Sequence, residues 1–309
     1  LQYLSNIDYK PIRYISFAHD EETYKALEAS KAWSKAEMIA PKQFREEISP
    51  YFNANPKKYI SALVSEDCWQ ATPGKVVDLV RNLGIAAGGT VMEDCRVLEA
   101  CREGKYTSVL VQTHDKKYVE YRTEHFVNAL GSGAGKLCDS MGIDAGLYPV
   151  RHQAFITRRL PMLGKHGTNL DMLIDRQDYK GFSAVYGQQI AYTGQIIGCA
   201  SPKLDVMRID KNLKVNTKAF LEIVSEMFSE WIPDLAGVGI QAVWAGYYTE
   251  PRYIVDPELG LFVGMRGHGF MLSQYIARMY VDKLLGRPVP EYFEKLKLNG
   301  PGLSEKAFK

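Results

Sequence analysis

Two glycine-rich turns are the segments whose composition is best suited to holding a charged ligand. The first is Gly131-Ser132-Gly133-Ala134-Gly135, which follows an apolar run, and the second is Gly267-His268-Gly269, which precedes a long apolar stretch. A helix that starts at such a turn offers free backbone N–H groups and a partial positive charge of about +0.5. Glycine also lets a ligand approach the backbone closely. These turns suit a phosphate, or an electron-rich ring edge that takes up negative charge.

Neither turn matches a strict nucleotide-binding motif. Lys136 stands where the dinucleotide fingerprint has its third glycine, and Leu272 stands at that position after the second turn. Leu130 and Leu137 occupy the first-glycine and Ser/Thr positions of a phosphate-binding loop. A glycine turn between a strand and a helix most often only ends one element and allows the next to begin. A structural role and a binding role therefore both stay open for these turns.

Four side chains near the second turn could contribute chemistry. Arg266 directly precedes it, and Arg252 lies in an aromatic cluster upstream. A cation gains nothing from the positive end of a helix, so a functional role for Arg266 is as well supported as a structural one. A guanidinium can bind a carboxylate in a bidentate fork. For His268 and Tyr248 the alternatives are a hydrogen-bonded structural role and simple packing.

Helical and strand-like patterns alternate along the chain. Helical spacing predicts helices over 20–35, 42–48, 73–84, 136–141, 218–231 and 270–285. Alternation predicts strands over 13–17, 62–64, 109–111, 118–121, 124–130, 150–158, within 171–198, and over 260–264. Thr72 is expected to cap the third helix, with Pro73 in its first turn and Gly84 at its end. The order predicts a mixed α/β and α+β chain with two domains built from alternating segments.

Charge and cysteine content exclude several classes of protein. The 309 residues include 38 basic and 36 acidic side chains, a formal net charge of +2, which gives no electrostatic reason to bind nucleic acid. No run reaches the ~18 apolar residues that a membrane span needs. The five cysteines are scattered without a Cys-x-x-Cys pair, so neither a metal site nor a disulfide framework is expected. We therefore expect a cytoplasmic, reducing environment.

Four segments, taken in order, carry a family resemblance. They are 126–134 (FVNALGSGA), 148–153 (YPVRHQ), 244–249 (WAGYYT) and 264–271 (GMRGHGFM). The set resembles the D-amino-acid oxidase superfamily of FAD-dependent enzymes, which includes sarcosine and glycine oxidases and dimethylglycine dehydrogenase-like enzymes. In that family these segments are the second flavin-binding strand, the crossing into the substrate domain, the stretch before the active-site loop, and the motif over the flavin ring.

The resemblance implies FAD, and it assigns cofactor-binding residues by position. The pyrimidine edge of the flavin would be met by Gly267, His268, Gly269, Phe270 and Met271. The ribityl-diphosphate would be met by Ala129, Gly131 and Gly133, and the adenine by the backbone of Arg96 and Val97. Backbone N–H groups and a helix dipole at the ring edge would stabilise its developing negative charge. No cysteine follows Cys199, which excludes the cysteine linkage of some members, so the FAD is expected to be non-covalent.

The resemblance also implies a substrate site. Arg252 or Arg266 would bind a substrate carboxylate, while Tyr248 and His152 would form the pocket wall. His152 replaces a glycine that is usual in the family. Met271 stands where monomeric sarcosine oxidases carry a lysine used in oxygen activation, so a dehydrogenase is as well supported as an oxidase.

The family's N-terminal Gly-x-Gly-x-x-Gly unit has no counterpart in the chain, since residues 1–17 align with what normally follows it. We therefore expect a Rossmann-like FAD-binding domain that is incomplete at its N-terminus and interleaved with a β-sheet-rich substrate domain. The expected FAD-binding segments are 60–148 and 240–290, the substrate domain 1–59 and 149–239, and the C-terminal tail 291–309.

The sequence thus predicts a flavin-dependent amine or amino-acid oxidase or dehydrogenase. It would oxidise the C–N bond of an amino acid or secondary amine by hydride transfer to flavin. One alternative is an FAD-dependent 2-hydroxy-acid dehydrogenase with the same flavin site. Another is a non-catalytic subunit or truncated fragment that cannot hold FAD alone. Sheet edges and apolar faces left without neighbours would favour a partner chain or a homo-oligomer.

Overall fold

The computed structural model describes residues 4–33, 35–53, 55, 57–178, 180–203, 213 and 217–302. Its main feature is an eight-stranded mixed sheet in the order β11-β7-β10-β9-β8-β1-β3-β2. The strands are β1 (Lys10–Ala18), β2 (Ala36–Ile39), β3 (Ser61–Gln70), β7 (Tyr148–Arg159), β8 (Met172–Asp175), β9 (Phe182–Gln189), β10 (Gln195–Pro202) and β11 (Ile240–Glu250). Neighbouring strands are antiparallel except β1 and β8, which run parallel.

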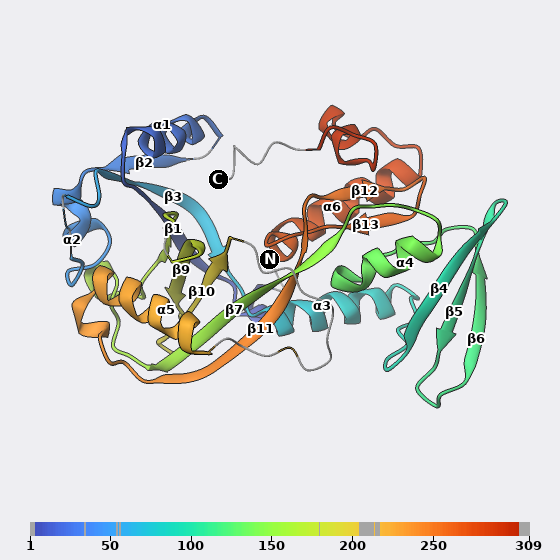
Figure 1. The fold of residues 1–309 in the computed structure, drawn as a ribbon, viewed down its shortest axis with the longest axis horizontal. Coiled ribbons are helices and arrows are strands. Elements are labelled where there is room, and N and C mark those ends of the chain that lie inside the picture. The colour runs from blue at the N-terminus through green and yellow to red at the C-terminus, as the bar shows by residue number, and fades with distance from the viewer. Residues whose placement is uncertain are drawn as a thin grey trace.

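One face of the large sheet carries the main hydrophobic core. Helix α5 (Thr217–Trp231) lies against this face with α2 (Phe44–Glu47) beside it, and both contribute aromatic side chains to the core (Figure 1). The helix approaches closely because β9 has a glycine beneath it. A Cβ built on Gly187 would come within 2.5 Å of the Phe228 ring. Over the β1–β3–β2 end of the sheet, α1 (Glu21–Ser30) covers the opposite face.

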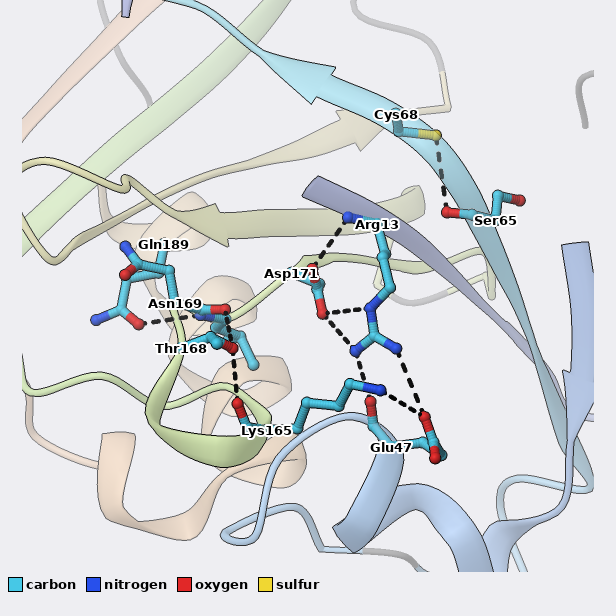
Figure 2. Close-up of polar contacts among 10 residues, drawn as sticks. Arg13, Glu47, Ser65, Cys68, Lys165, Thr168, Asn169, Asp171 and Gln189 are labelled. Atoms are coloured by element: carbon cyan, nitrogen blue, oxygen red, sulfur yellow. Dashed lines mark hydrogen bonds and ion pairs between the residues drawn. The ribbon is translucent and has the colours of Figure 1, made fainter. Parts of the chain in front are cut away.

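A buried ion network fixes the parallel pair of strands (Figure 2). The backbone N–H of Arg13 donates to Asp171 Oδ1 at 3.0 Å, and its guanidinium donates to Asp171 Oδ2 at 2.6 and 3.0 Å. The same guanidinium donates to the Glu47 carbonyl at 2.6 Å, while Lys165 pairs with the Glu47 carboxylate at 2.9 Å. The buried Asp171 carboxylate and the half-buried Glu47 carboxylate are thereby neutralised where β1 meets the segment leading into β8.

The other elements form a second region (Figure 1). A three-stranded antiparallel sheet consists of β4 (Arg96–Glu103), β5 (Tyr106–Gln112) and β6 (Tyr118–Thr123). Between this sheet and the large one lie α3 (Pro73–Ala86), α4 (Ala134–Ser140) and α6 (Gly269–Leu284), with the β12 (Ile254–Asp256) and β13 (Leu261–Val263) hairpin. Short 3-10 helices cover Leu4–Ile7, Lys31–Trp33, Pro41–Gln43, Gly131–Gly133, Lys165–Gly167, Pro233–Leu235 and Glu291–Leu296.

Several local predictions are confirmed and others are wrong. The β5–β6 hairpin forms with its turn at 113–117, and α6 ends before Gly286, whose φ is +68°. The predicted strand over 124–130 is wrong, because within it only Asn128 makes a β-bridge. The helix predicted over 20–35 ends at Ser30. Thr72 occupies the N-cap position of α3, but its hydroxyl donates to Asp8 at 2.6 Å instead of capping the helix.

The large sheet extends further along the chain than the segments predicted for the substrate domain. Both β3 and β11 fall in the ranges predicted for FAD binding, and both are strands of this sheet. They are 10 and 11 residues long, and they pair with β1 and β7 over nearly their whole length. Among the described residues, no helix is long and apolar enough to cross a membrane.

Candidate functional site

The two glycine turns lie at the same edge of the second region. Asn128 and Leu261 form a parallel bridge, with Asn128 N–H donating to the Gly260 carbonyl at 2.8 Å. The Asn128 side-chain amide donates to the Ala134 carbonyl at 3.0 Å, which holds the start of α4. Because the two segments run in the same direction, the turns that follow them lie side by side.

The second turn leaves the start of α6 open. The first helical hydrogen bond is from Leu272 N–H to the His268 carbonyl at 3.0 Å, and no side chain caps the helix. In the described part of the chain, the N–H groups of Gly269, Phe270 and Met271 have no acceptor. A 16-residue helix with three free N–H groups is a site for negative charge.

The side chain of His268 is held in place and kept neutral. Its Nδ1 lies 2.6 Å from the Tyr253 hydroxyl. Burial lowers the pKa of His268, and the charges of Arg266 and Arg176 lower that pKa further. The imidazole is therefore uncharged at neutral pH, and the positive field of the turn comes from the helix end and the two arginines.

A cavity of about 290 Å³ opens on the face of the large sheet that α5 does not cover. It is lined by His152, Gln153, Ala154, Met172, Tyr186, Gly187, Gln188, Ile197, Gly198, Cys199, Trp244, Gly246 and Tyr248. The His152 ring stacks on Tyr248 with centroids 3.7 Å apart and planes at 23°. The hydroxyls of Tyr186 and Tyr248 lie 3.3 Å apart. The wall is mostly apolar, and its polar groups include the hydroxyl pair, the His152 imidazole and Gln188.

The glycine turn packs directly on this cavity wall. A Cβ built on Gly267 would lie 2.7 Å from Cε2 of Tyr248, so only glycine allows the turn to approach the ring. The structure therefore brings together His152, Tyr248 and Gly267, which the sequence assigned to the pocket wall and the ring-facing turn. A flat ligand over the α6 N-terminus would lie next to the cavity.

Burial sets the protonation of the polar groups in the wall. It raises the pKa of Cys199 to about 11 and the pKa of Tyr186 well above 10.0, and it also raises the pKa of Tyr248. These groups are neutral at physiological pH and act as hydrogen-bond donors and acceptors rather than as bases.

The two arginines predicted to bind substrate have other partners. Arg252 donates to the carbonyls of Gly300, at 2.8 Å, and Leu298, which holds it in the C-terminal segment. Arg266 forms an ion pair with Glu250 at the end of β11. Its backbone has a φ of +49°, the left-handed region that non-glycine residues seldom adopt. Arg266 therefore fixes the entry to the turn, and neither arginine lines the cavity.

The remaining predicted cofactor residues lie in the second region. Phe270 and Met271 follow the turn with exposed side chains, and Ala129 and Gly131 are exposed beside the first turn. Gly131 has a φ of +55°. Arg96 is exposed at the start of β4, and Val97 packs against the cluster around Leu137 and Val109.

Sequence reasoning did not assign three residues that line the cavity, Tyr186, Cys199 and Trp244. All three point to one face of the sheet, since Tyr186 pairs with Cys199 and Cys199 with Ala154, which in turn pairs with Trp244. Strand alternation could have grouped them, but the register between β7, β9, β10 and β11 cannot be read from one sequence.

Comparison with known proteins agrees with this geometry. A family model described as FAD dependent oxidoreductase (DAO) matches residues 2–283. The chain therefore belongs to the DAO family of FAD-dependent oxidoreductases. Curated protein sequences give no match.

Solved structures share the fold at low identity. L-proline dehydrogenase from P. horikoshii is 23% identical with a TM-score of 0.77, and the match covers 96% of this chain and 79% of that one. Glycine oxidase from Geobacillus kaustophilus is 15% identical with a TM-score of 0.76, covering 96% and 78%. L-α-glycerophosphate oxidase from Mycoplasma pneumoniae, solved with FAD bound, is 16% identical with a TM-score of 0.73, covering 91% and 74%. The mixed α/β fold is thus that of this family.

The ring-facing part of the site fits FAD. A flavin ring accepts negative charge at its pyrimidine edge, and the three open N–H groups of α6 supply donors at a positive helix end. Gly267 allows the backbone to approach a flat ligand, because a side chain there would strike Tyr248. The exposed Phe270 and Met271 side chains offer apolar contact beside these donors.

Proposed function

We propose that the protein is an FAD-dependent enzyme that oxidises the C–N bond of an amino acid or secondary amine. The observation that supports this most is the contact between Gly267 and Tyr248, because it joins the α6 N-terminus to a small apolar cavity. When bound, FAD supplies the two-electron acceptor for this oxidation.

The protein's own residues would then bind and orient. The N–H groups of Gly269, Phe270 and Met271 would hold the ring edge without a covalent link, and Gly131 and Gly133 would approach the diphosphate. Arg96, Val97 and Ala129 stay proposed contacts for the adenine and ribityl parts. Tyr248, stacked on His152, would form the wall against which the substrate lies and would keep water from the reacting C–H.

The spectrum of the purified protein tests the cofactor. We expect the visible absorbance of an oxidised flavin, either as isolated or after incubation with FAD, and release of free FAD on denaturation because the link is non-covalent. A protein that stays colourless with excess FAD contradicts the proposal.

Substrate class is tested by anaerobic bleaching of that absorbance. We expect amino acids or secondary amines to bleach it and 2-hydroxy acids to leave it unchanged. A 2-hydroxy-acid dehydrogenase is the second candidate, because the cavity hydroxyls are neutral and can bind an alcohol as well as an amine. Bleaching by hydroxy acids alone would establish that candidate. Repeating the assay with oxygen as the acceptor separates an oxidase from a dehydrogenase.

We also propose a reducing, cytoplasmic location. All five cysteines are described and are free thiols, and Cys199 lines the cavity. Fractionation of the source cells, followed by thiol labelling of each fraction, tests this location.

A further inference from the structure

Glu250 and Arg266 form an ion pair at the entry to the second glycine turn. Glu250 is the last residue of β11, two residues after the cavity residue Tyr248, and Arg266 directly precedes Gly267. The Glu250 carboxylate accepts a hydrogen bond from Arg266 Nε. Only 15% of the Glu250 side chain and 17% of the Arg266 side chain are exposed. Because the pair is shielded from solvent, each charge acts on its surroundings more strongly than a surface charge would.

Arg266 adopts a backbone conformation that the surrounding contacts must hold. Its φ of +49° lies in a region that is strained for a residue with a Cβ. The turn is closed by the N–H of His268, which donates to the Met265 carbonyl at 3.1 Å. Gly267 then packs against the Tyr248 ring, where a Cβ would lie 2.7 Å from Cε2. The anchored Arg266 side chain therefore fixes the point from which Gly267 and the open N–H groups of α6 follow.

The charges of Glu250 and Arg266 act in opposite directions at the turn. The Tyr253 hydroxyl lies 2.6 Å from His268 Nδ1. Burial raises the pKa of Tyr253, the charge of Arg266 lowers that pKa, and the charge of Glu250 raises it. The charge of Arg266 also adds to the effect of burial in lowering the pKa of His268. Glu250 therefore offsets the field of Arg266 beside a helix end that already attracts negative charge.

We propose that Glu250 is a positioning residue that acts through Arg266 and limits the positive charge at the ring edge of bound FAD. This inference rests on the proposed function, because it requires a flavin at the start of α6. With Glu250 removed, the charge of Arg266 is no longer offset by this carboxylate. It would then stabilise the negative charge that the ring takes up on reduction. Glu250 thereby makes the ring a weaker electron acceptor and lets the reduced ring pass its electrons on more readily.

A purely structural ion pair predicts a different pattern from this electrostatic role. Loss of either partner of a structural pair would disturb the turn in the same way and shift every measured property in the same direction. The electrostatic role predicts opposite effects on the flavin. A neutral residue at 250 leaves the site with one more positive charge, and a neutral residue at 266 leaves it with one more negative charge.

The midpoint potential of the bound FAD in single and double variants tests the proposal. Glu250→Gln should raise the equilibrium constant for flavin reduction about tenfold, which is about 30 mV for a two-electron couple. Arg266→Gln should lower it by a similar factor, and the double variant should return close to the wild-type value. Glu250→Asp keeps the charge and should shift the potential least. A fall or no change in Glu250→Gln, or shifts of the same sign in both single variants, overturns the proposal.

Glu230→Gln is the matched control, because it also removes a carboxylate from a partly buried ion pair. Glu230 pairs with Lys58, and their side chains are 32% and 20% exposed. Glu230 lies near the end of α5, on the core face of the large sheet. This variant should leave the potential unchanged. An equal rise in Glu230→Gln would attribute the effect to the net charge of the protein and overturn the proposal.

The pKa of His268 gives a second measurement that needs no turnover and no cofactor. It is followed by NMR on the full chain as isolated, whether or not the chain carries FAD. Arg266→Gln should raise this pKa and Glu250→Gln should lower it, because the imidazole then meets less or more positive charge. Shifts in the same direction overturn the assignment of Glu250. Opposite shifts in a protein that cannot be loaded with FAD would instead contradict the proposed function alone.

The double variant also keeps the test decisive if one single variant does not fold. Arg266→Gln compared with the double variant isolates the charge of Glu250, which must lower the potential. Glu250→Gln compared with the wild-type protein isolates the same charge in the presence of Arg266. A Glu250 charge that leaves the potential unchanged in the available comparison overturns the proposal.

Discussion

Gly267 has to be a glycine because of one ring. A Cβ at this position would lie 2.7 Å from Tyr248, which forms the cavity wall, whereas a Cβ on Gly246 in the same cavity meets nothing within 4 Å. We expect Gly267→Ala to cost about 1–3 kcal/mol of stability through overpacking and to weaken substrate binding. Thermal unfolding and KM measure the two effects. Gly246→Ala is the control, and it should lower the stability by less than half as much as Gly267→Ala. An equal loss of stability in the two variants would contradict the steric role of Tyr248.

At the residue scale, the sequence could group the turn with Tyr248 and His152, but it could not give the partners of the two arginines. Gly267, Tyr248 and His152 were assigned from motif order, and the structure brings them into contact. Arg252 and Arg266 were assigned because they stand near the turn, but their partners are carbonyls and a carboxylate that only the fold brings close.

At the element scale, the end of β8 is held by a charged pair whose strength depends on pH. His19 Nε2 lies 2.6 Å from Asp175, and His19 Nδ1 lies 2.9 Å from the Lys58 carbonyl, so both ring nitrogens have acceptors. Burial lowers the pKa of His19, but the hydrogen bond and charge of Asp175 outweigh it and the net pKa is raised above 6.5. Below pH 6.5 the His19–Asp175 pair contributes its full stabilisation to the folded state. This contribution is lost as the pH rises through the pKa of His19 in the folded protein.

His19→Gln should therefore destabilise more in acid than in base. We expect a loss of about 3 kcal/mol near pH 6, since a buried charge loses its partner, and a smaller loss near pH 9, where His19 is neutral. Urea unfolding at both pH values measures the difference. The control His114→Gln, in the exposed β5–β6 turn, should leave the free energy of unfolding unchanged at both pH values. A stability loss in His19→Gln that grows as the pH rises would contradict the expected pH dependence.

Elements with strong local signals were predicted well. The β5–β6 hairpin and α6 carry turn residues and apolar spacing that define them without help from the rest of the chain. The strand predicted over 124–130 failed because β structure needs a neighbour along its length, and only Asn128 finds one in Leu261. Helix α3 has the predicted apolar spacing, yet Val77, Val80 and Leu83 are exposed in the fold.

At the scale of the whole molecule, two helices present apolar side chains to solvent. These are Val77, Val80 and Leu83 on α3, and Phe270, Met271 and Tyr275 on α6. Exposed apolar surface of this kind favours association with a second copy or with another chain. We expect the sedimentation coefficient to rise with concentration, and Val77→Lys with Leu83→Lys to suppress the rise. Glu222→Lys, on exposed α5 surface, is the control. Concentration-independent monomers would contradict this expectation.

The alternation of strand–turn–helix units with a β-rich middle predicts two domains built from alternating segments, whereas the extent of the large sheet could not be predicted. Its order places β8, from the middle of the chain, between β9 and β1. Strand order depends on pairings between distant segments, and a single sequence carries no record of them. The family resemblance gave the architecture in outline, and the register then determined which side chains line the cavity.

The contact between Arg13 and Asp171 spans 158 residues. During synthesis, β1 leaves the ribosome long before the segment that leads into β8 is made. The pairing of β1 with β8 can therefore form only after a further 158 residues have been synthesised. The sheet that carries the cavity then closes through this distant parallel pairing, which is entropically costly to initiate. The substrate side of the protein is therefore expected to mature late, and amide protection in β1 and β8 should appear together in a refolding experiment.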